Sequence, residues 1–173
     1  MTMRVDEIAI RDFLHTRYPR LVAAVALVCG SRPAAEDAVQ EALLRAWERS
    51  EKGEEIESLN AWVTTVSLNV ARSGLRRVMA ERRARSRLGR DFEPETSGDR
   101  IDVERALARL PRRQREAVVL RYYLQMDTRE VADVLGVHEG TVKSTLSRAR
   151  TALAGALGEA DTETEEANDR GSR

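Results

Sequence analysis

The chain has 173 residues, of which 34% are charged and only 4% are aromatic, and its formal net charge is zero. This length fits one ordinary domain or two small ones, and the abundance of alanine, leucine and arginine favours helices over sheets. The single cysteine excludes an internal disulfide and a Cys-x-x-Cys metal site, and no apolar run is long enough to span a bilayer. We therefore expect an all-α protein of two small helical domains that is soluble and cytoplasmic, with no cofactor, no metal and no membrane insertion.

Charge is distributed unevenly along the chain. Residues 61–90 carry 8 basic residues against 1 acidic residue, whereas residues 158–173 carry 6 acidic residues against 2 basic ones. Such zoning indicates several partners, one of which is polyanionic.

The first predicted helix covers residues 5–29, where apolar residues recur at helical intervals at Phe13, Leu14, Leu21, Val25 and Val28. Pro19 lies inside this segment and either kinks the helix or splits it in two. Cys29 ends the apolar run and is expected to be a buried structural thiol.

The helix predicted over residues 33–49 is the most strongly two-faced in the chain. Its apolar face should enter the core through Val39, Leu43, Ala46 and Trp47. The opposite face carries Asp37, Gln40, Glu41, Leu44, Arg45 and Glu48. A polar face organised in this way favours a partner surface, although helix charges can also be simply solvated.

A third helix begins near Leu59, with an apolar stripe at Trp62, Val63, Val66 and Val70, and its later turns are almost wholly basic. Residues 87–100 then combine glycine, proline, serine and mixed charge without periodicity, which predicts a flexible linker. The first domain is therefore expected to cover residues 1–86.

The second domain is expected at residues 101–157. A short helix should stop at Pro111, and the segment "RRQREAVVLRYYL" should form another helix with its core at Ala117, Val118, Leu120 and Leu124. Residues 158–173 lack aromatic and branched aliphatic residues, so they are predicted to form a disordered acidic tail.

Residues 128–147 have the spacing of a helix-turn-helix. Ala132 is small where two helices would cross, and Gly136 permits the turn between them. The local core is expected to consist of Val131, Leu135, Val137 and Val142. On the second helix one side is apolar, with Val142, Leu146, Ala149 and Leu153. The other side carries Lys143, Ser144, Ser147, Arg148 and Thr151, with Arg150 at the border. Such donors can bind phosphates or base edges, so DNA is the favoured partner, and an ordinary solvated face is the alternative.

Four motifs occur in order: "AEDAVQEALLRAW" at 35–47, "LNAWVTTVSLNVARSGLRR" at 59–77, "LARLPRRQREAVVLRYYL" at 107–124 and "EVADVLGVHEGTVKSTLSRAR" at 130–150. Together they resemble the extracytoplasmic-function (ECF, group IV) sigma factors of bacterial RNA polymerase. The resemblance covers nearly everything from Phe13 to Leu157 except the linker. It implies that residues 1–86 form the sigma-70 region 2 domain and residues 101–157 the region 4 domain.

The resemblance also implies functions for particular residues. Core polymerase would bind through its β′ clamp helices to Asp37, Gln40, Glu41, Leu44 and Arg45. The −10 promoter element would meet Asn69, near a flipped-out base, and Arg72, Arg76 and Arg77, which would hold phosphates. The −35 element would meet Lys143, Ser144, Ser147, Arg148 and Arg150. The polymerase β flap and an anti-sigma factor are the further partners implied, and Ser73 stands where many relatives carry an acidic residue.

Two other functions are the alternatives, a helix-turn-helix regulator and an enzyme. A helix-turn-helix regulator that does not join the polymerase core would need a sensing domain, yet the sequence shows neither a β/α pocket pattern nor a phosphoacceptor aspartate at a strand end. An enzyme would need a metal site or a nucleophile with its base, and the nearest cluster of carboxylates, at Glu36, Asp37 and Glu41, has no histidine or glycine-rich loop beside it. We therefore expect no catalytic residues.

Overall fold

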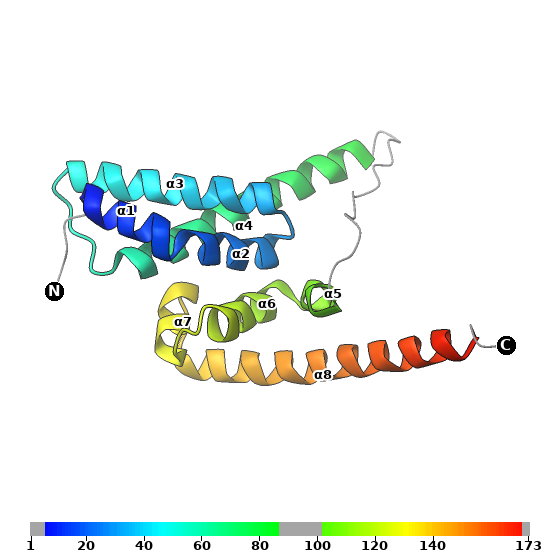
Figure 1. Cartoon of the computed structure of the whole chain (residues 1–173). Helices are drawn as coiled ribbons and strands as arrows, with labels where there is room; N and C mark the ends of the chain where they lie inside the picture. Colours follow the sequence, from blue (N-terminus) through cyan, green and yellow to red (C-terminus); the bar gives the residue numbers. More distant parts are fainter. Residues whose placement is uncertain (1–5, 87–101, 171–173) are drawn as a thin grey trace. The chain divides into compact units, whose positions relative to one another are not determined.

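The computed structural model describes residues 6–86 and 102–170, and the side chains within 6–76 and 103–155. The chain divides into two compact units, of which the first contains helices α1 to α4 and the second contains α5, α6, α8 and most of α7 (Figure 1). The described residues are mainly helical and contain no β-strand. The all-α class with two small helical domains is confirmed.

The predicted N-terminal helix is split into α1 (Glu7–Thr16) and α2 (Tyr18–Cys29). Asp6 caps α1 by accepting a hydrogen bond from the Ala9 amide at 2.8 Å, and Pro19 lies in the first turn of α2, where its missing N–H leaves no bond unmade. Phe13 is buried, whereas Leu14 is 43% exposed. The next position on a helix points about 100° away, so Leu14 does not share the side that packs.

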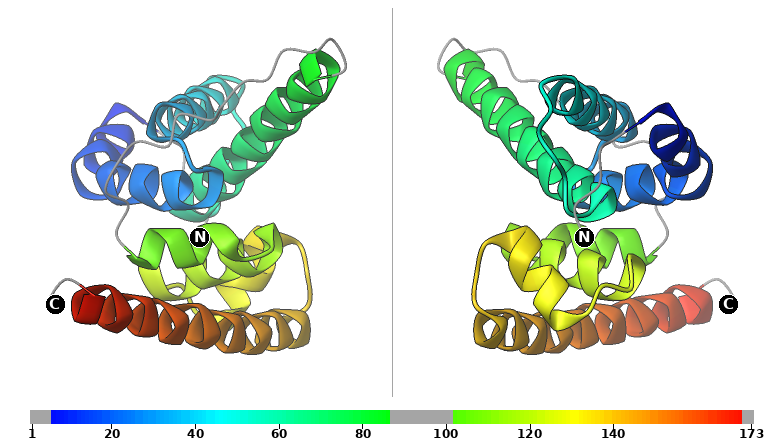
Figure 2. Two further views of the ribbon diagram at one scale, coloured as in Figure 1. Left: turned by 90° about the vertical axis from the view of Figure 1, so that its right-hand side faces the viewer. Right: turned by 90° about the vertical axis from the view of Figure 1, so that its left-hand side faces the viewer.

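The other two helices of the first unit are α3 (Arg32–Glu51) and α4 (Leu59–Ser86). α3 packs against both α2 and α4, and the residues that fill the space between them include Val22, Val25, Val39, Ala42, Ala46, Val63 and Leu68. Figure 2 shows the C-terminal turns of α4 extending beyond the other three helices. Cys29 is half-buried rather than buried, because it lies at the end of α2, where its Sγ donates to the Ser31 carbonyl at 3.2 Å.

The second unit contains α5 (Asp102–Arg109), α6 (Arg112–Val118), the π-helix η1 (Val119–Tyr123), α7 (Thr128–Leu135) and α8 (Glu139–Arg170). α5 and α6 both pack on α8. The predicted helix over "RRQREAVVLRYYL" loosens into η1, where the Leu124 amide donates to the Val119 carbonyl five residues back. Leu124 is consequently only half-buried, although the sequence pattern assigned it to the core.

α8 is longer than the sequence predicted. Residues 158–170, expected as a disordered tail, continue the helix to Arg170. This segment contains no proline and has four glutamates and two alanines, which are strong helix formers, so it can extend a helix already nucleated by packing. Within the described part of the chain, no helix is both long enough and apolar enough to cross a membrane.

Candidate functional site

The solvent side of α3 carries the residues that the resemblance assigns to polymerase binding. Asp37, Gln40 and Arg45 are exposed and Glu41 is half-buried, while Ala38, Ala42 and Ala46 pack inward. Glu41 accepts a hydrogen bond from Arg45 Nε at 2.8 Å, one helical turn away. We call Asp37, Gln40, Glu41, Leu44 and Arg45 the α3 face.

The α3 face includes an exposed apolar residue, Leu44, and a second one, Trp47, lies beside it. Leu44 is 53% exposed and Trp47 is 37% exposed, three residues apart on the same helix. The sequence pattern assigned Trp47 to the core, and that prediction is wrong. The buried residues of α3 are mainly alanines, so the helices approach closely along that side, and the large indole of Trp47 lies at its edge.

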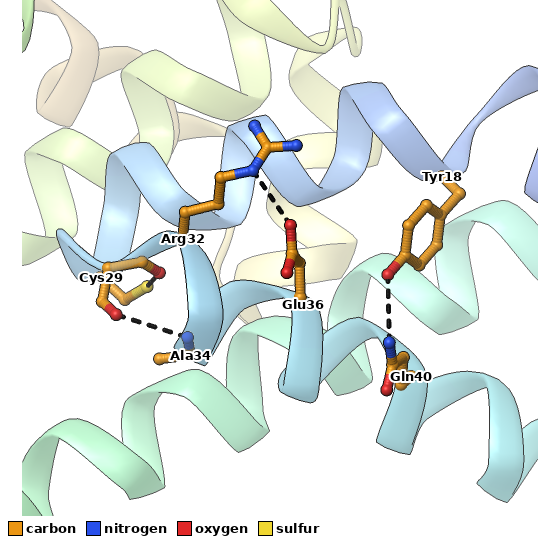
Figure 3. A network of polar contacts seen from close by, with 7 residues as sticks. Tyr18, Cys29, Arg32, Ala34, Glu36 and Gln40 are labelled. Atoms are coloured by element: carbon orange, nitrogen blue, oxygen red, sulfur yellow. Dashed lines mark hydrogen bonds and ion pairs between the residues drawn. The ribbon is translucent and has the colours of Figure 1, made fainter.

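Gln40 is linked to a residue that the sequence did not single out. Its Nε2 donates to the Tyr18 hydroxyl oxygen on α2 at 3.4 Å, and Figure 3 shows the two side chains pointing toward each other. Nearby, Arg32 Nε donates to Glu36 Oε1 at 3.0 Å. The two residues of the Gln40–Tyr18 pair lie 22 positions apart, and no helical periodicity could have indicated the contact.

The candidate −10 residues on α4 contact one another. Arg72 Nη1 donates to Asn69 Oδ1 at 2.8 Å, and Arg76 Nη2 donates to the Ser73 hydroxyl at 3.0 Å. Asn69 and Arg76 are exposed, whereas Arg72 is only 9% exposed. The phosphate contact implied for Arg72 stays a prediction, and of the two arginines Arg76 is the one whose side chain is exposed. The side chain of Arg77 lies outside the described residues.

The candidate −35 residues on α8 are all on the surface. We call this set, Lys143, Ser144, Ser147, Arg148 and Arg150, the α8 stripe, and each member is exposed. Val142, Leu146 and Ala149 on the other side are buried. Arg150, expected at the border, faces solvent.

The turn before α8 has the geometry of a helix-turn-helix. Gly136 adopts φ +65°, a left-handed conformation that suits glycine, and Ala132, Val131 and Leu135 of α7 are buried. α7 begins with a capping box, in which the Glu130 amide donates to Asp127 Oδ1 and the Asp127 amide donates to Glu130 Oε2. The predicted turn and most of its local core are confirmed; Val137 is half-buried.

Comparison with known proteins identifies the family of the chain. The model of Sigma-70 region 2 matches residues 14–83, and the model of Sigma-70, region 4 matches residues 100–153. The ECF RNA polymerase sigma factor SigL of Mycobacterium tuberculosis is 34% identical over 163 residues, which cover 85% of this chain and 88% of SigL. The chain belongs to the ECF sigma factors of the sigma-70 family.

Other members of the family resemble this ECF sigma factor over a similar span. The RNA polymerase sigma-E factor of Streptomyces coelicolor is 31% identical over 151 residues, which cover 86% of this chain and 85% of the relative. The sigma factor RpoE from Bartonella quintana, solved in complex with the anti-sigma factor NepR, matches with a TM-score of 0.70 and 28% identity. That match covers 88% of this chain and 98% of RpoE.

The family match accounts for both units of this ECF sigma factor. A helix-turn-helix regulator that does not join the polymerase would need only the second unit to bind DNA, yet the first unit matches region 2 on its own. The alternative function therefore leaves α1 to α4 without an explanation.

Proposed function

We propose that this sigma factor binds core RNA polymerase through the α3 face and directs it to promoters recognised by α4 and α8. The observation that carries the proposal is the division of α8 into two sides. Every member of the α8 stripe is exposed, and Val142, Leu146 and Ala149 opposite them are buried against the second unit. A helix held in this way presents donors outward and keeps its orientation.

Binding of the β′ clamp helices to the α3 face is supported by its mixture of charge and apolar surface. Asp37 and Glu41 offer carboxylates to a basic partner, and Leu44 with Trp47 offers apolar area that gains free energy when covered. Interfaces commonly combine an aromatic anchor at the centre with charged groups around it.

Recognition and opening of the −10 element by α4 is supported by exposed polar groups along one side of the helix. Asn69 and Arg76 are seven residues apart, two helical turns, and both are exposed. Flipping a base out of the stack costs a few kcal/mol. An amide that hydrogen-bonds the base and a cation that holds the backbone would offset part of that cost.

Reading of the −35 element by the α8 stripe is supported by the chemistry of its side chains. Arg148 and Lys143 can donate to the O6 and N7 atoms of guanine in the major groove, and Ser144 and Ser147 are small enough to allow close approach to the phosphate backbone. The second helix of a helix-turn-helix is the one that enters the groove.

Two further partners are proposed, an anti-sigma factor and the polymerase β flap. The Bartonella quintana RpoE structure contains the anti-sigma factor NepR, and that relative matches nearly the whole of this chain, which supports a partner of the same kind here. Action on core RNA polymerase implies a cytoplasmic location.

A run-off transcription assay with purified core polymerase tests the proposal. Templates from promoters found by mapping start sites in cells that overexpress the protein should give transcripts only when the protein is present. Comigration with core polymerase in the absence of DNA distinguishes a sigma factor from a regulator that binds only DNA. A sigma factor must bind core polymerase directly, whereas such a regulator need not. Failure to comigrate together with normal binding to DNA would overturn the proposal in favour of the regulator.

A further inference from the structure

The side chains around Asn69 form a short hydrogen-bonded chain along α4. Arg72 Nη1 donates to Asn69 Oδ1 at 2.8 Å. The Ser73 hydroxyl donates to the Asn69 backbone carbonyl at 3.0 Å and accepts from Arg76 Nη2 at 3.0 Å. A hydroxyl has one proton to donate and lone pairs to accept with, so Ser73 can make both bonds at once.

The bond from Arg72 fixes which end of the Asn69 amide faces outward. The oxygen and nitrogen of a carboxamide can exchange places by rotation of the side chain, and the hydrogen-bond partner decides between the two. A guanidinium has only donors, so it can hold Oδ1 but not Nδ2. Nδ2 then makes no hydrogen bond to any residue in the described part of the chain, and Asn69 is exposed.

Arg72 itself is poorly disposed to bind a phosphate. It is 9% exposed and follows Leu68 and Ala71, which face the core, on a helix that packs against α2 and α3. A phosphate contact would require the guanidinium to leave this position and its bond to Asn69. Arg76, one turn further along α4, is exposed and can reach the phosphate backbone of DNA instead.

We infer that Arg72 is a positioning residue, which holds Asn69 so that its Nδ2 reads a hydrogen-bond acceptor on an unpaired promoter base. This inference rests on the proposed function, in which Asn69 meets the −10 element. The selected base must present an oxygen or an unprotonated ring nitrogen to Nδ2. A base with an amino group at the same point is rejected, because two donors would then face each other.

The inference predicts how base preference changes with each side chain. Without Arg72 the amide of Asn69 can turn either end outward, so it accepts from an amino group as readily as it donates to an oxygen. Arg72→Met should therefore reduce discrimination at one −10 position by about three- to tenfold, the range expected for one hydrogen bond. Methionine keeps an unbranched apolar stem of similar reach, which preserves packing.

The experiment selects transcribed templates from a duplex library randomised across the −35 and −10 elements, using core polymerase with the full chain. Asn69→Ala first identifies the position that Asn69 reads, as the one whose base preference flattens. Arg72→Met should flatten that same position, and Arg72→Lys, which retains a donor, should restore part of the preference. The matched control is Arg76→Met. This variant should weaken the binding of all promoter sequences alike and make the affinity for DNA less dependent on salt concentration.

A second variant tests the inference without changing the buried Arg72, so that a folding defect at that position cannot explain its result. Asn69→Asp keeps an oxygen for Arg72 but turns a second oxygen toward the DNA, so the preferred base should change to one that presents an amino group, such as cytosine through N4 or adenine through N6. Circular dichroism checks that every variant stays helical.

The possible results separate the inference from the proposed function. If the unmodified chain gives no transcripts from any library member, the proposed function fails and the inference fails with it. If it transcribes but Arg72→Met and Asn69→Asp both keep the original base preference, the inference alone is overturned. Loss of preference at the Asn69 position in Arg72→Met, with rescue by Arg72→Lys, establishes it.

Discussion

The two units present their polar side chains in different ways. On α4 in the first unit, Asn69, Arg72, Ser73 and Arg76 are joined by hydrogen bonds before any partner arrives. On α8 in the second unit, the side chains of Lys143, Arg148 and Arg150 make no hydrogen bond or ion pair within the described part of the chain. A site for a single unpaired base gains affinity when its hydrogen-bond donors are already held in place, because less conformational entropy is lost on binding. Side chains that enter the groove of a duplex can adjust to bases and phosphates as they bind.

The largest expected effect tests whether the first unit docks through the α3 face. Charge reversal at Asp37 and Glu41 together should lower the affinity for core polymerase by at least about 100-fold, because two attractive contacts become repulsive. Comigration with core polymerase and fluorescence anisotropy measure the loss. Glu7→Lys with Asp12→Lys makes the same change in net charge on exposed positions of α1, and an equal loss in that control would assign the effect to net charge.

The second prediction concerns the exposed basic side chains of α8. Lys143→Ala and Arg148→Ala should each weaken promoter binding by about 1–3 kcal/mol and relax the preference at one −35 position. Arg148→Lys keeps the charge but loses the two-pronged donor geometry, so it should lose base preference while retaining phosphate attraction. Anisotropy on labelled promoter variants distinguishes these results. A loss that is uniform across sequences would make Arg148 a phosphate contact.

The third prediction concerns the turn that orients α8. Gly136→Ala should destabilise the second unit by about 1–2 kcal/mol, because φ +65° puts a Cβ in an unfavourable conformation although nothing lies within 4 Å of it. Gly155→Ala, inside α8 with equally open space around it, should raise stability by up to about 1 kcal/mol. Thermal denaturation followed by circular dichroism gives both values. Equal shifts for the two variants would contradict the role assigned to the backbone at Gly136.

The smallest expected effect lies in the core of the first unit. The Ser67 hydroxyl is buried on α4 without a hydrogen-bond partner among the described residues, so Ser67→Ala should leave stability unchanged or raise it by about 1 kcal/mol. Thr64, also buried, donates from Oγ1 to the Asn60 carbonyl at 2.7 Å, and Thr64→Val should lower stability by about 1 kcal/mol. Urea denaturation measures both, and a clear loss in Ser67→Ala would mean that the hydroxyl has a partner after all.

The sequence by itself determined the α8 stripe and the turn before it. Both depend on contacts between near neighbours along the chain, since helical periodicity orients Lys143 and Arg148 away from Val142 and Leu146, and glycine at 136 permits the left-handed backbone. The all-α class followed from composition for a similar reason, because helix propensity is a local property.

Only the tertiary structure decided the state of Trp47, Arg72 and Gln40. Periodicity gives the direction of a side chain around its helix, but burial depends on how closely the next helix approaches and on how far a long side chain reaches. The small residues between α3 and its neighbours leave Trp47 at the edge, whereas the packing of α4 against α2 and α3 leaves Arg72 only 9% exposed. Gln40 meets Tyr18 only because α2 and α3 pack together, and contacts between separate helices leave no period in the sequence.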